Sequence, residues 1–136
     1  MTTVDQLPSG LPIQVADAEL LARFVFSDSH VNRSGNVKKG AFMPAPEQSA
    51  LSVTRLNGLQ SNDMEHYAAQ ARGTRPSEAK GFAVLQTGRV RAEGFQVVAD
   101  EPPPRHAHIQ HFPPGKDDQI EKAQALALHV LRYVGL

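Results

Sequence analysis

Between Phe95 and Phe112 the chain reads FQVVADEPPPRHAHIQHF, and this stretch says most about the fold. Residues 95–99 are rich in aromatic and β-branched side chains and predict a strand. The proline triplet that follows cannot be helical and sends the chain as an extended segment into residues 106–112. Two extended segments joined by prolines are therefore expected here.

The rest of the chain alternates between strand and helix patterns. Short apolar runs bounded by turn residues predict strands at 50–56 and 81–86. Apolar spacing and capping residues predict helices at 17–25 (N-cap Asp17), at 62–73 (capping box Asn62 and Glu65) and from Asp118 through Val134, while 87–93 fits a helical turn or a hairpin. The sequence therefore predicts an α+β or α/β fold. We expect a single two-layer domain, in which a small sheet of about four strands is packed by three or four helices.

The first residues differ from the remainder of the chain. Pro8, Gly10 and Pro12 exclude a helix there. Residues 1–15 are therefore predicted to form a flexible N-terminal arm, and residues 16–136 a single globular domain. A domain of this size buries roughly two-thirds of the surface of its unfolded chain.

Composition narrows the classes of function. The 136 residues include 14 basic and 14 acidic side chains, so a net charge of zero gives no general attraction to nucleic acid or membrane. The absence of cysteine excludes disulfides and thiolate zinc sites. The N-terminus lacks the basic and apolar regions of a signal peptide, and no apolar run is long enough to cross a membrane. We therefore expect a soluble, cytoplasmic protein.

Three histidines lie close together in the stretch quoted above. His106 and His108 are two residues apart, so in an extended chain their imidazoles point to the same face, whereas His111 points away. Two imidazoles on one face are candidate ligands for a divalent metal, with a third ligand from His30, Asp100, Glu101 or another loop. The alternative is that one histidine faces solvent while the other hydrogen-bonds to a backbone carbonyl.

A second candidate site is the loop around His30. No acidic residue occurs between Asp28 and Glu47, whereas Arg33, Lys38 and Lys39 all fall in that span. Cationic side chains with hydroxyl, amide and glycine neighbours suit the binding of an oxyanion or phosphate, although the loop matches no phosphate-loop pattern. A solvated surface loop is the alternative.

Arg55 is aligned with Leu51 and Val53 on one face of its predicted strand. Such an arginine lies at the rim of the sheet, pairs under a loop, or binds an anionic ligand. A further set of basic residues lies at Arg72, Arg75, Lys80, Arg89 and Arg91. This set could contact a nucleic acid backbone. Because no aromatic residue is interleaved with it, however, base stacking is not indicated, and a solvated face is the preferred interpretation.

Several short motifs are spread over residues 20–133. They are Leu21-Ala22-Arg23-Phe24, Phe26-Ser27-x-Ser29-His30, Lys39-Gly40-Ala41-Phe42-x-Pro44, Leu51-Ser52-Val53-x-Arg55 and His106-Ala107-His108-Ile109. Together they resemble a family of small bacterial proteins with no assigned function. The resemblance implies no fold, substrate or catalytic role, but it suggests that His30, Arg55 and the His106–His108 pair belong to one surface.

Two functions are compatible with these residues. The first is a small binding or accessory protein that recognises an anionic ligand, for example a phosphate-containing one, or a partner protein. The basic surface that it would use carries His30, Arg33, Lys38, Lys39, Arg55, His106 and His108. The alternative is a small hydrolase, either a metal enzyme or a metal-independent phosphodiesterase or nuclease, using His106 and His108 with His30 and Arg55. The binding role is preferred because no catalytic motif is recognisable; a homodimer formed through an uncovered sheet edge is compatible with either.

Overall fold

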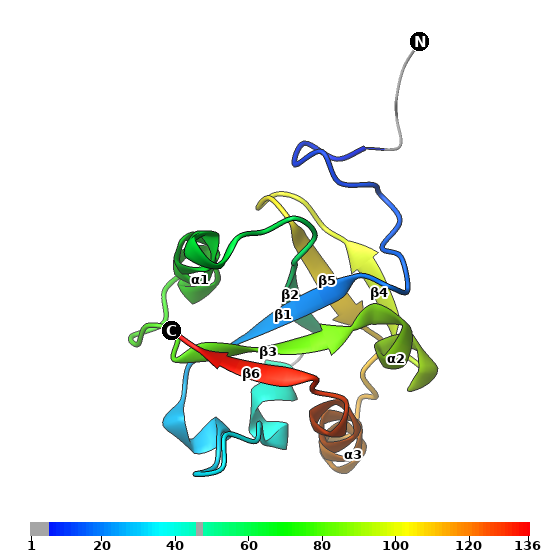
Figure 1. The fold of residues 1–136 in the computed structure, drawn as a ribbon. Helices are drawn as coiled ribbons and strands as arrows, with labels where there is room; N and C mark the ends of the chain where they lie inside the picture. The colour runs from blue at the N-terminus through cyan, green and yellow to red at the C-terminus, as the bar shows by residue number, and fades with distance from the viewer. Residues whose placement is uncertain (1–5, 46–47) are drawn as a thin grey trace.

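The fold is built on one antiparallel sheet. The computed structural model describes residues 6–45 and 48–136, and within them six strands form this sheet. The strands are β1 (Leu20–Val25), β2 (Ala50–Arg55), β3 (Gly81–Gln86), β4 (Gln96–Ala99), β5 (His106–Gln110) and β6 (Arg132–Gly135). Their order is β4-β5-β2-β1-β3-β6, and every neighbouring pair is antiparallel (Figure 1). β1 and β2 therefore lie inside the sheet, whereas β4 and β6 form its edges.

Helices cover both faces of this sheet. The α-helices are α1 (Met64–Arg72), α2 (Thr87–Ala92) and α3 (Lys116–Leu128), and the 3₁₀ helices are η1 (Asp28–His30), η2 (Lys39–Phe42) and η3 (Ser61–Asp63). α1 packs on one face, whereas η2, α2 and α3 contribute to the hydrophobic cluster of the other. The predicted two-layer domain with about four strands and three or four helices is therefore wrong. In the described residues, six antiparallel strands lie between two layers that together contain three α-helices.

The helix predicted at 17–25 is wrong, because residues 20–25 form β1. Leu21 and Val25 enter the larger hydrophobic cluster, whereas Ala22 and Phe24 enter the smaller one on the opposite face. A strand covered on both faces is apolar at nearly every position, so it lacks the alternation that identifies a half-buried strand. Such a short apolar run cannot be told from a buried helix by its periodicity.

The C-terminal helix is shorter than predicted. It begins at Lys116 with Gly115 as N-cap and ends at Leu128, so neither Asp118 nor Val134 has its predicted role. Residues 132–135 form β6, which pairs with β3 so that Phe82 lies opposite Val134. The β-branched and aromatic residues at the end of the chain suit this edge strand better than a helix.

The other predicted elements are found close to their expected positions. Strands occupy 50–55, 81–86, 96–99 and 106–110, and residues 87–92 are helical rather than a hairpin. α1 begins at Met64 and ends before Gly73, which has a positive φ of 53°. Its N-cap is Asp63 without a side-chain capping bond, so the predicted capping role of Asn62 is not observed. None of the helices in the described part of the chain is long and apolar enough to cross a membrane.

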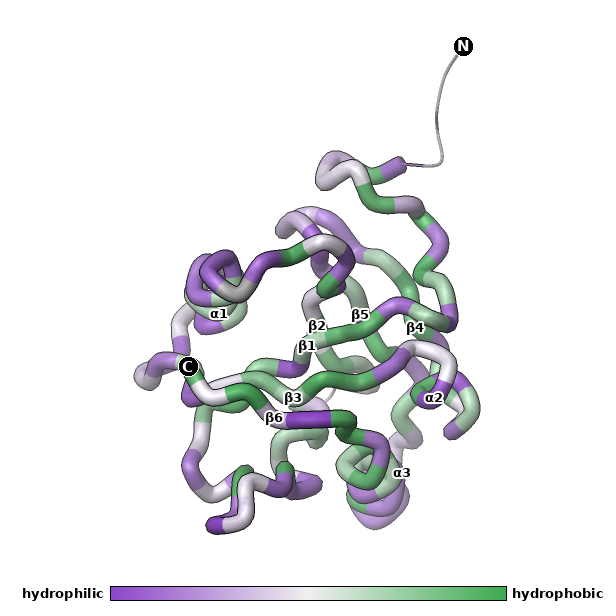
Figure 2. The backbone as a smooth tube through the Cα atoms, viewed as in Figure 1, coloured by the Kyte–Doolittle hydropathy of each residue, from purple (hydrophilic) through white to green (hydrophobic). Residues whose placement is uncertain are grey.

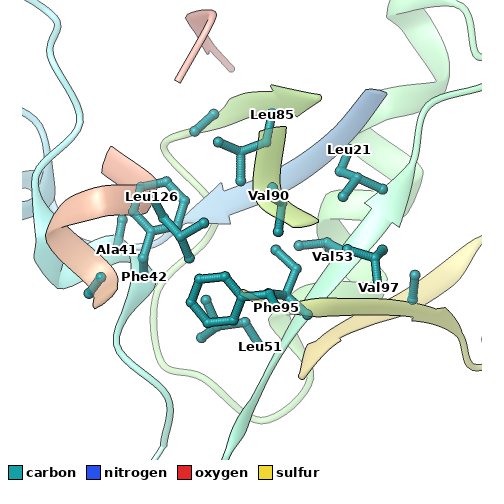
Figure 3. Close-up of a cluster of buried hydrophobic side chains, with 14 of the residues drawn as sticks. Leu21, Ala41, Phe42, Leu51, Val53, Leu85, Val90, Phe95, Val97 and Leu126 are labelled. Atoms are coloured by element: carbon teal, nitrogen blue, oxygen red, sulfur yellow. The ribbon is translucent and has the colours of Figure 1, made fainter. Parts of the chain in front are cut away.

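Two hydrophobic clusters hold the layers together. The larger contains Phe42 of η2, Leu126 of α3 and Phe95, packed over inward-facing residues of the strands (Figure 3). The smaller packs Met64 and Ala68 of α1 against the other face. β3, which is buried along most of its length, is coloured as largely hydrophobic in Figure 2. Both faces of the sheet are therefore covered, and the hydrophobic cluster under α1 is the smaller one.

The described part of the N-terminal segment contacts the domain at several points. The Ser9 hydroxyl lies 2.5 Å from the Glu101 carboxylate, and Val15 is buried in the larger cluster. Between them, the carbonyl oxygens of Pro12 and Gln14 accept hydrogen bonds from Arg55. Residues 1–5 lie outside the described residues, and the flexibility predicted for the arm stays a prediction.

Candidate functional site

A pocket of about 250 Å³ lies between α1 and the strands that α1 covers. Its lining comes from β1 and the residue that follows it, from β2, β5 and α1, and from the loops that follow α1 and β4. The lining residues are Arg23, Phe24, Phe26, Ser52, Val53, Thr54, Tyr67, Gln70, Ala71, Arg75, Pro103 and His106. Two arginines and a histidine are among these residues, and no aspartate or glutamate is. We call this feature the α1 pocket.

Arg23 lies where β1 and β2 separate. The two strands pair only at Leu21–Arg55 and Ala22–Thr54. Beyond that point the Arg23 guanidinium links β1 to η2 and to β2, because its Nε donates to the carbonyl of Ala41 and its Nη1 to the carbonyl of Ser52, each at 2.9 Å. These two bonds fix the planar group, which remains partly exposed toward the α1 pocket.

Arg23 also has an unfavourable electrostatic environment. Burial, together with the positive charge of Arg75, lowers the pKa of Arg23 to about 10. The group is still charged at neutral pH, but both of its hydrogen-bond partners are neutral carbonyls. In the described residues neither Arg23 nor Arg75 forms an ion pair with a carboxylate. An anion placed between the two guanidinium groups would relieve this repulsion.

Arg75 lines the same pocket and is held in place although it is exposed. Its guanidinium carbon lies 4.4 Å from the centre of the Phe26 ring, a cation–π contact. Its Nη1 donates to the carbonyl of Ala71, at 2.5 Å, and more weakly to that of Arg72, at the C-terminal end of α1. A cation at this end of a helix also interacts favourably with the helix dipole. Arg75 is therefore positioned by the fold.

His106 borders the α1 pocket and also belongs to a second group. The imidazoles of His106 and His108 are 4.7 Å apart between ring centres, on the face of β5 predicted from their two-residue spacing. The Oδ2 atom of Asp100 lies 3.6 Å from Nδ1 of His106 and 3.3 Å from Nδ1 of His108. One potential ligand atom from each residue lies within 4.8 Å of the others. We call these three residues the Asp100 cluster.

The surroundings of the Asp100 cluster affect its charge. Burial and the neighbouring His106 lower the pKa of His108, although Asp100 acts in the opposite direction. His108 is therefore neutral at pH 7, the form in which imidazole binds metals. Nδ1 of His106 lies 2.9 Å from the main-chain carbonyl of Asp100, so the predicted alternative of a histidine bonded to a carbonyl also holds for this residue.

Glu101, which was proposed as a third metal ligand, and His111, which was expected to point away, both lie outside the Asp100 cluster. Glu101 is engaged by Ser9 and by the backbone N–H of Arg105, which donates to its Oε2 at 3.1 Å. His111 follows the end of β5 with an exposed side chain and a positive φ of 80°. Neither belongs to the group of neighbouring ligand atoms found in the described residues. Of the three predicted partners of the histidine pair, only Asp100 reaches it.

Arg55 does not lie at the rim of the sheet or on its surface. It is 0% exposed and pairs through two hydrogen bonds of 2.9 Å with Glu19, which is itself 7% exposed. Its remaining contacts are with the carbonyls of Pro12 and Gln14. The pairing under a loop is therefore what the structure shows. Arg55 stabilises the junction between the N-terminal segment and β2 and is not part of the α1 pocket.

The basic loop is also separate from the histidine pair. His30, Lys38 and Lys39 line a groove of about 860 Å³ against α3 and β6, and Arg33 lines a neighbouring groove. Both lysines and Arg33 are exposed and make no ion pair in the described residues. His30 is held against Gly40, where an added Cβ would lie 2.6 Å from the imidazole. Burial and then the charge of Arg23 lower the pKa of His30.

Sequence reasoning missed the two arginines of the α1 pocket. Arg23 was placed in a helix that does not exist, and Arg75 was assigned to a solvated face. A signal for Arg23 was available, because it is the one charged residue in the apolar run from Leu20 to Phe26. Arg75 gave no comparable signal, since its position depends on Phe26, which is distant in sequence.

Comparison of the chain with protein-family models, with curated proteins and with solved structures found no match. The resemblance to a family of small bacterial proteins therefore stays a prediction, and the site is interpreted from its own geometry.

Proposed function

We propose that this protein binds a small anionic ligand, of the phosphate or carboxylate class, in the α1 pocket. The observation that carries this proposal is the pair of arginines, Arg23 and Arg75, that line one pocket in which no lining residue is acidic. Two guanidinium groups that line one pocket without a carboxylate, and whose charges act on one another, repel each other unless an anion neutralises them. The planar, forked donors of arginine match phosphate and carboxylate oxygens.

The rest of the pocket supports the same ligand class. Ser52, Thr54 and Tyr67 bring hydroxyl groups to its lining, and these can donate hydrogen bonds to anionic oxygens. A volume of about 250 Å³ is below the roughly 300–1,000 Å³ that is typical for drug-sized ligands. The pocket therefore suits a small ion or a single charged group of a larger molecule.

The α1 pocket is preferred over the groove at His30. The cations of that groove, Lys38 and Lys39, are exposed and flexible, and fixing them on a ligand costs side-chain entropy. Arg23, in contrast, is already fixed by two hydrogen bonds. A binding role is also preferred over the small hydrolase, because Arg55 is engaged by Glu19 and cannot hold an oxyanion as that mechanism requires.

A titration with inorganic phosphate tests the proposal. Binding to the full chain is measured by isothermal calorimetry at low salt, for the wild type and for Arg75→Ala. We expect the wild type to bind phosphate and Arg75→Ala to bind it at least about 10-fold more weakly, because charge-assisted hydrogen bonds contribute about 1.5–3 kcal/mol each. A carboxylate such as acetate, titrated in parallel, shows which oxyanion geometry is preferred.

Two variants serve as matched controls. Arg89→Ala removes an exposed arginine from α2, outside the pocket lining, and should leave binding unchanged. Lys38→Ala removes a cation from the other groove and should also have no effect. The proposal fails if neither anion binds the wild type, or if Lys38→Ala weakens binding while Arg75→Ala does not.

A further inference from the structure

We propose that the Asp100 cluster binds one divalent transition-metal ion, with Asp100, His106 and His108 as its protein ligands and zinc as the representative ion. This inference goes beyond anion binding in the α1 pocket and does not depend on either arginine. It rests on three potential ligand groups that meet on one face of β5, where one atom from each lies within 4.8 Å of the others.

The distances fit a small tetrahedral ion. Two ligands bound tetrahedrally to zinc at about 2.0–2.1 Å lie about 3.3–3.4 Å apart. The Oδ2 atom of Asp100 is 3.3 Å from Nδ1 of His108 and 3.6 Å from Nδ1 of His106. Small rotations of the side chains are therefore enough to bring all three groups to a common ion. When the ion binds, Nδ1 of His106 gives up its proton to solvent, and its hydrogen bond to the carbonyl of Asp100 is lost.

The backbone around the cluster is rigid, which favours a preformed site. β5 is paired on both sides, with β2 and with β4, so that His108 lies between Ser52 and Val98. Asp100 follows β4 directly, and its N–H donates to the carbonyl of His106 at 2.9 Å. Ligands carried by a paired strand and the first residue beyond its neighbour lose little conformational entropy when an ion binds.

The chemistry of the ligands selects the class of metal. Two imidazoles and one carboxylate suit zinc, cobalt, nickel or copper rather than magnesium or calcium, which prefer oxygen ligands. Three protein ligands leave at least one coordination position open, and the cluster is accessible to solvent because Asp100 is 53% exposed. Water occupies that position in such sites, as in zinc sites with three protein ligands.

Zinc binding to the full chain tests this proposal. Protein treated with EDTA and then dialysed is titrated with zinc chloride in competition with a chromogenic chelator. We expect one zinc ion per chain for the wild type, and affinities at least about 10-fold weaker for His108→Ala and for Asp100→Asn. A titration with cobalt(II) provides a second readout, since binding to nitrogen and oxygen ligands at low coordination number produces visible absorption bands.

Two control variants test whether zinc binds at the Asp100 cluster or at other histidines of the chain. His66→Ala removes an exposed histidine of α1 that contacts Gln70, and His111→Ala removes the neighbour that points away from the cluster. Both should bind zinc like the wild type, and circular dichroism should show that every variant is folded. The proposal is overturned if the wild type binds no zinc, if His108→Ala and Asp100→Asn keep the wild-type affinity, or if the affinity depends on His66 or His111.

Discussion

Arg55 and Arg23 lie on neighbouring strands, yet only Arg55 is paired with a carboxylate in the described residues. Arg55 is completely buried and meets the carboxylate of Glu19 through two hydrogen bonds of 2.9 Å. Arg23 is partly buried, donates to two neutral carbonyls and lies near a second arginine, Arg75. An arginine whose counter-charge is supplied by its own chain stabilises the fold. One that lacks such a charge beside a pocket is available to a ligand from outside.

The comparison also explains why Arg55 was difficult to interpret from its strand pattern. Leu51, Val53 and Arg55 do share one face of β2, and that face enters the larger hydrophobic cluster. Glu19 neutralises Arg55 from just before β1, 36 residues away in sequence. Nothing in the local sequence around Arg55 identifies that partner. Burial and pairing of this kind are tertiary properties.

The largest effect is expected from breaking the buried pair. Glu19→Ala leaves the Arg55 guanidinium buried without a counter-charge, which typically costs about 3–5 kcal/mol. We expect a loss of this size in the free energy of unfolding, measured by urea denaturation followed by circular dichroism. A loss below about 1 kcal/mol would contradict the structural role of the pair. Arg55 would then again be a candidate for ligand binding.

Anion binding should stabilise the protein through Arg23 and not through Arg55. A ligand at 100 times its dissociation constant stabilises the folded state by about 2.7 kcal/mol. We expect phosphate to raise the free energy of unfolding of the wild type by this order, and Arg23→Gln to show little of this gain at the same concentration. Urea denaturation with and without phosphate measures the difference.

The Glu19→Ala variant sharpens that experiment. Phosphate should stabilise it by the same increment as the wild type, because Arg55 does not line the α1 pocket and separate sites act additively. A larger increment in Glu19→Ala would mean that phosphate reaches the unpaired Arg55, and the distinction between the two arginines would fail.

Acid should weaken the buried pair, with a smaller effect than the Glu19→Ala substitution. Burial alone raises the pKa of Glu19, but the hydrogen bonds and charge of Arg55 and the N–H of Ala16 outweigh it, so the net pKa lies below the ordinary value of 4.5. The stability that the ionised carboxylate contributes is therefore fully present above about pH 4.5 and is lost as the pH falls through the lower pKa of the folded state. Protonated Glu19 still accepts hydrogen bonds, which limits the loss. Urea denaturation at pH 7, 4.5 and 3 should show a decline in wild-type stability that exceeds the decline in Glu19→Gln.

The strands with a clear local pattern were predictable from sequence. β2, β3 and β4 each combine β-branched or aromatic residues with turn residues at their ends, whereas β5 was expected because the preceding prolines exclude a helix, and all four occur where they were expected. β1 was not recognised because it is covered on both faces and is apolar at every position except Arg23, which resembles a buried helix segment. β6 continues the apolar spacing of α3, so that only its pairing with β3 distinguishes strand from helix.

The candidate site was predictable only in part, for a similar reason. The two-residue spacing placed His106 and His108 on one face, because that geometry depends on β5 alone. The proximity of Asp100 depends on the turn between β4 and β5, and Asp100 was one of three residues named as a third ligand. The suggested surface combining His30, Arg55 and the histidine pair is not found, since the first two lie in a separate groove and in the core. The sequence pattern describes single elements, so it could not predict which residues of distant elements contact one another.

The smallest expected effect comes from an exposed ion pair that provides a reference for the buried one. Nη1 of Arg91 lies 2.7 Å from Oδ1 of Asp17, which is closer than the 2.9 Å between Arg55 and Glu19. The Asp17 side chain is 75% exposed, however, so water solvates both charges and substitutes for the pair when it is broken. Exposed pairs of this kind contribute about 0–1 kcal/mol.

We therefore expect Asp17→Asn to lower the free energy of unfolding by less than about 1 kcal/mol in urea denaturation at moderate salt. A loss as large as that of Glu19→Ala would show that contact distance, not burial, sets the strength of these pairs. Burial could then no longer be used to assign Arg55 to the stability of the fold and the more exposed Arg23 to ligand binding.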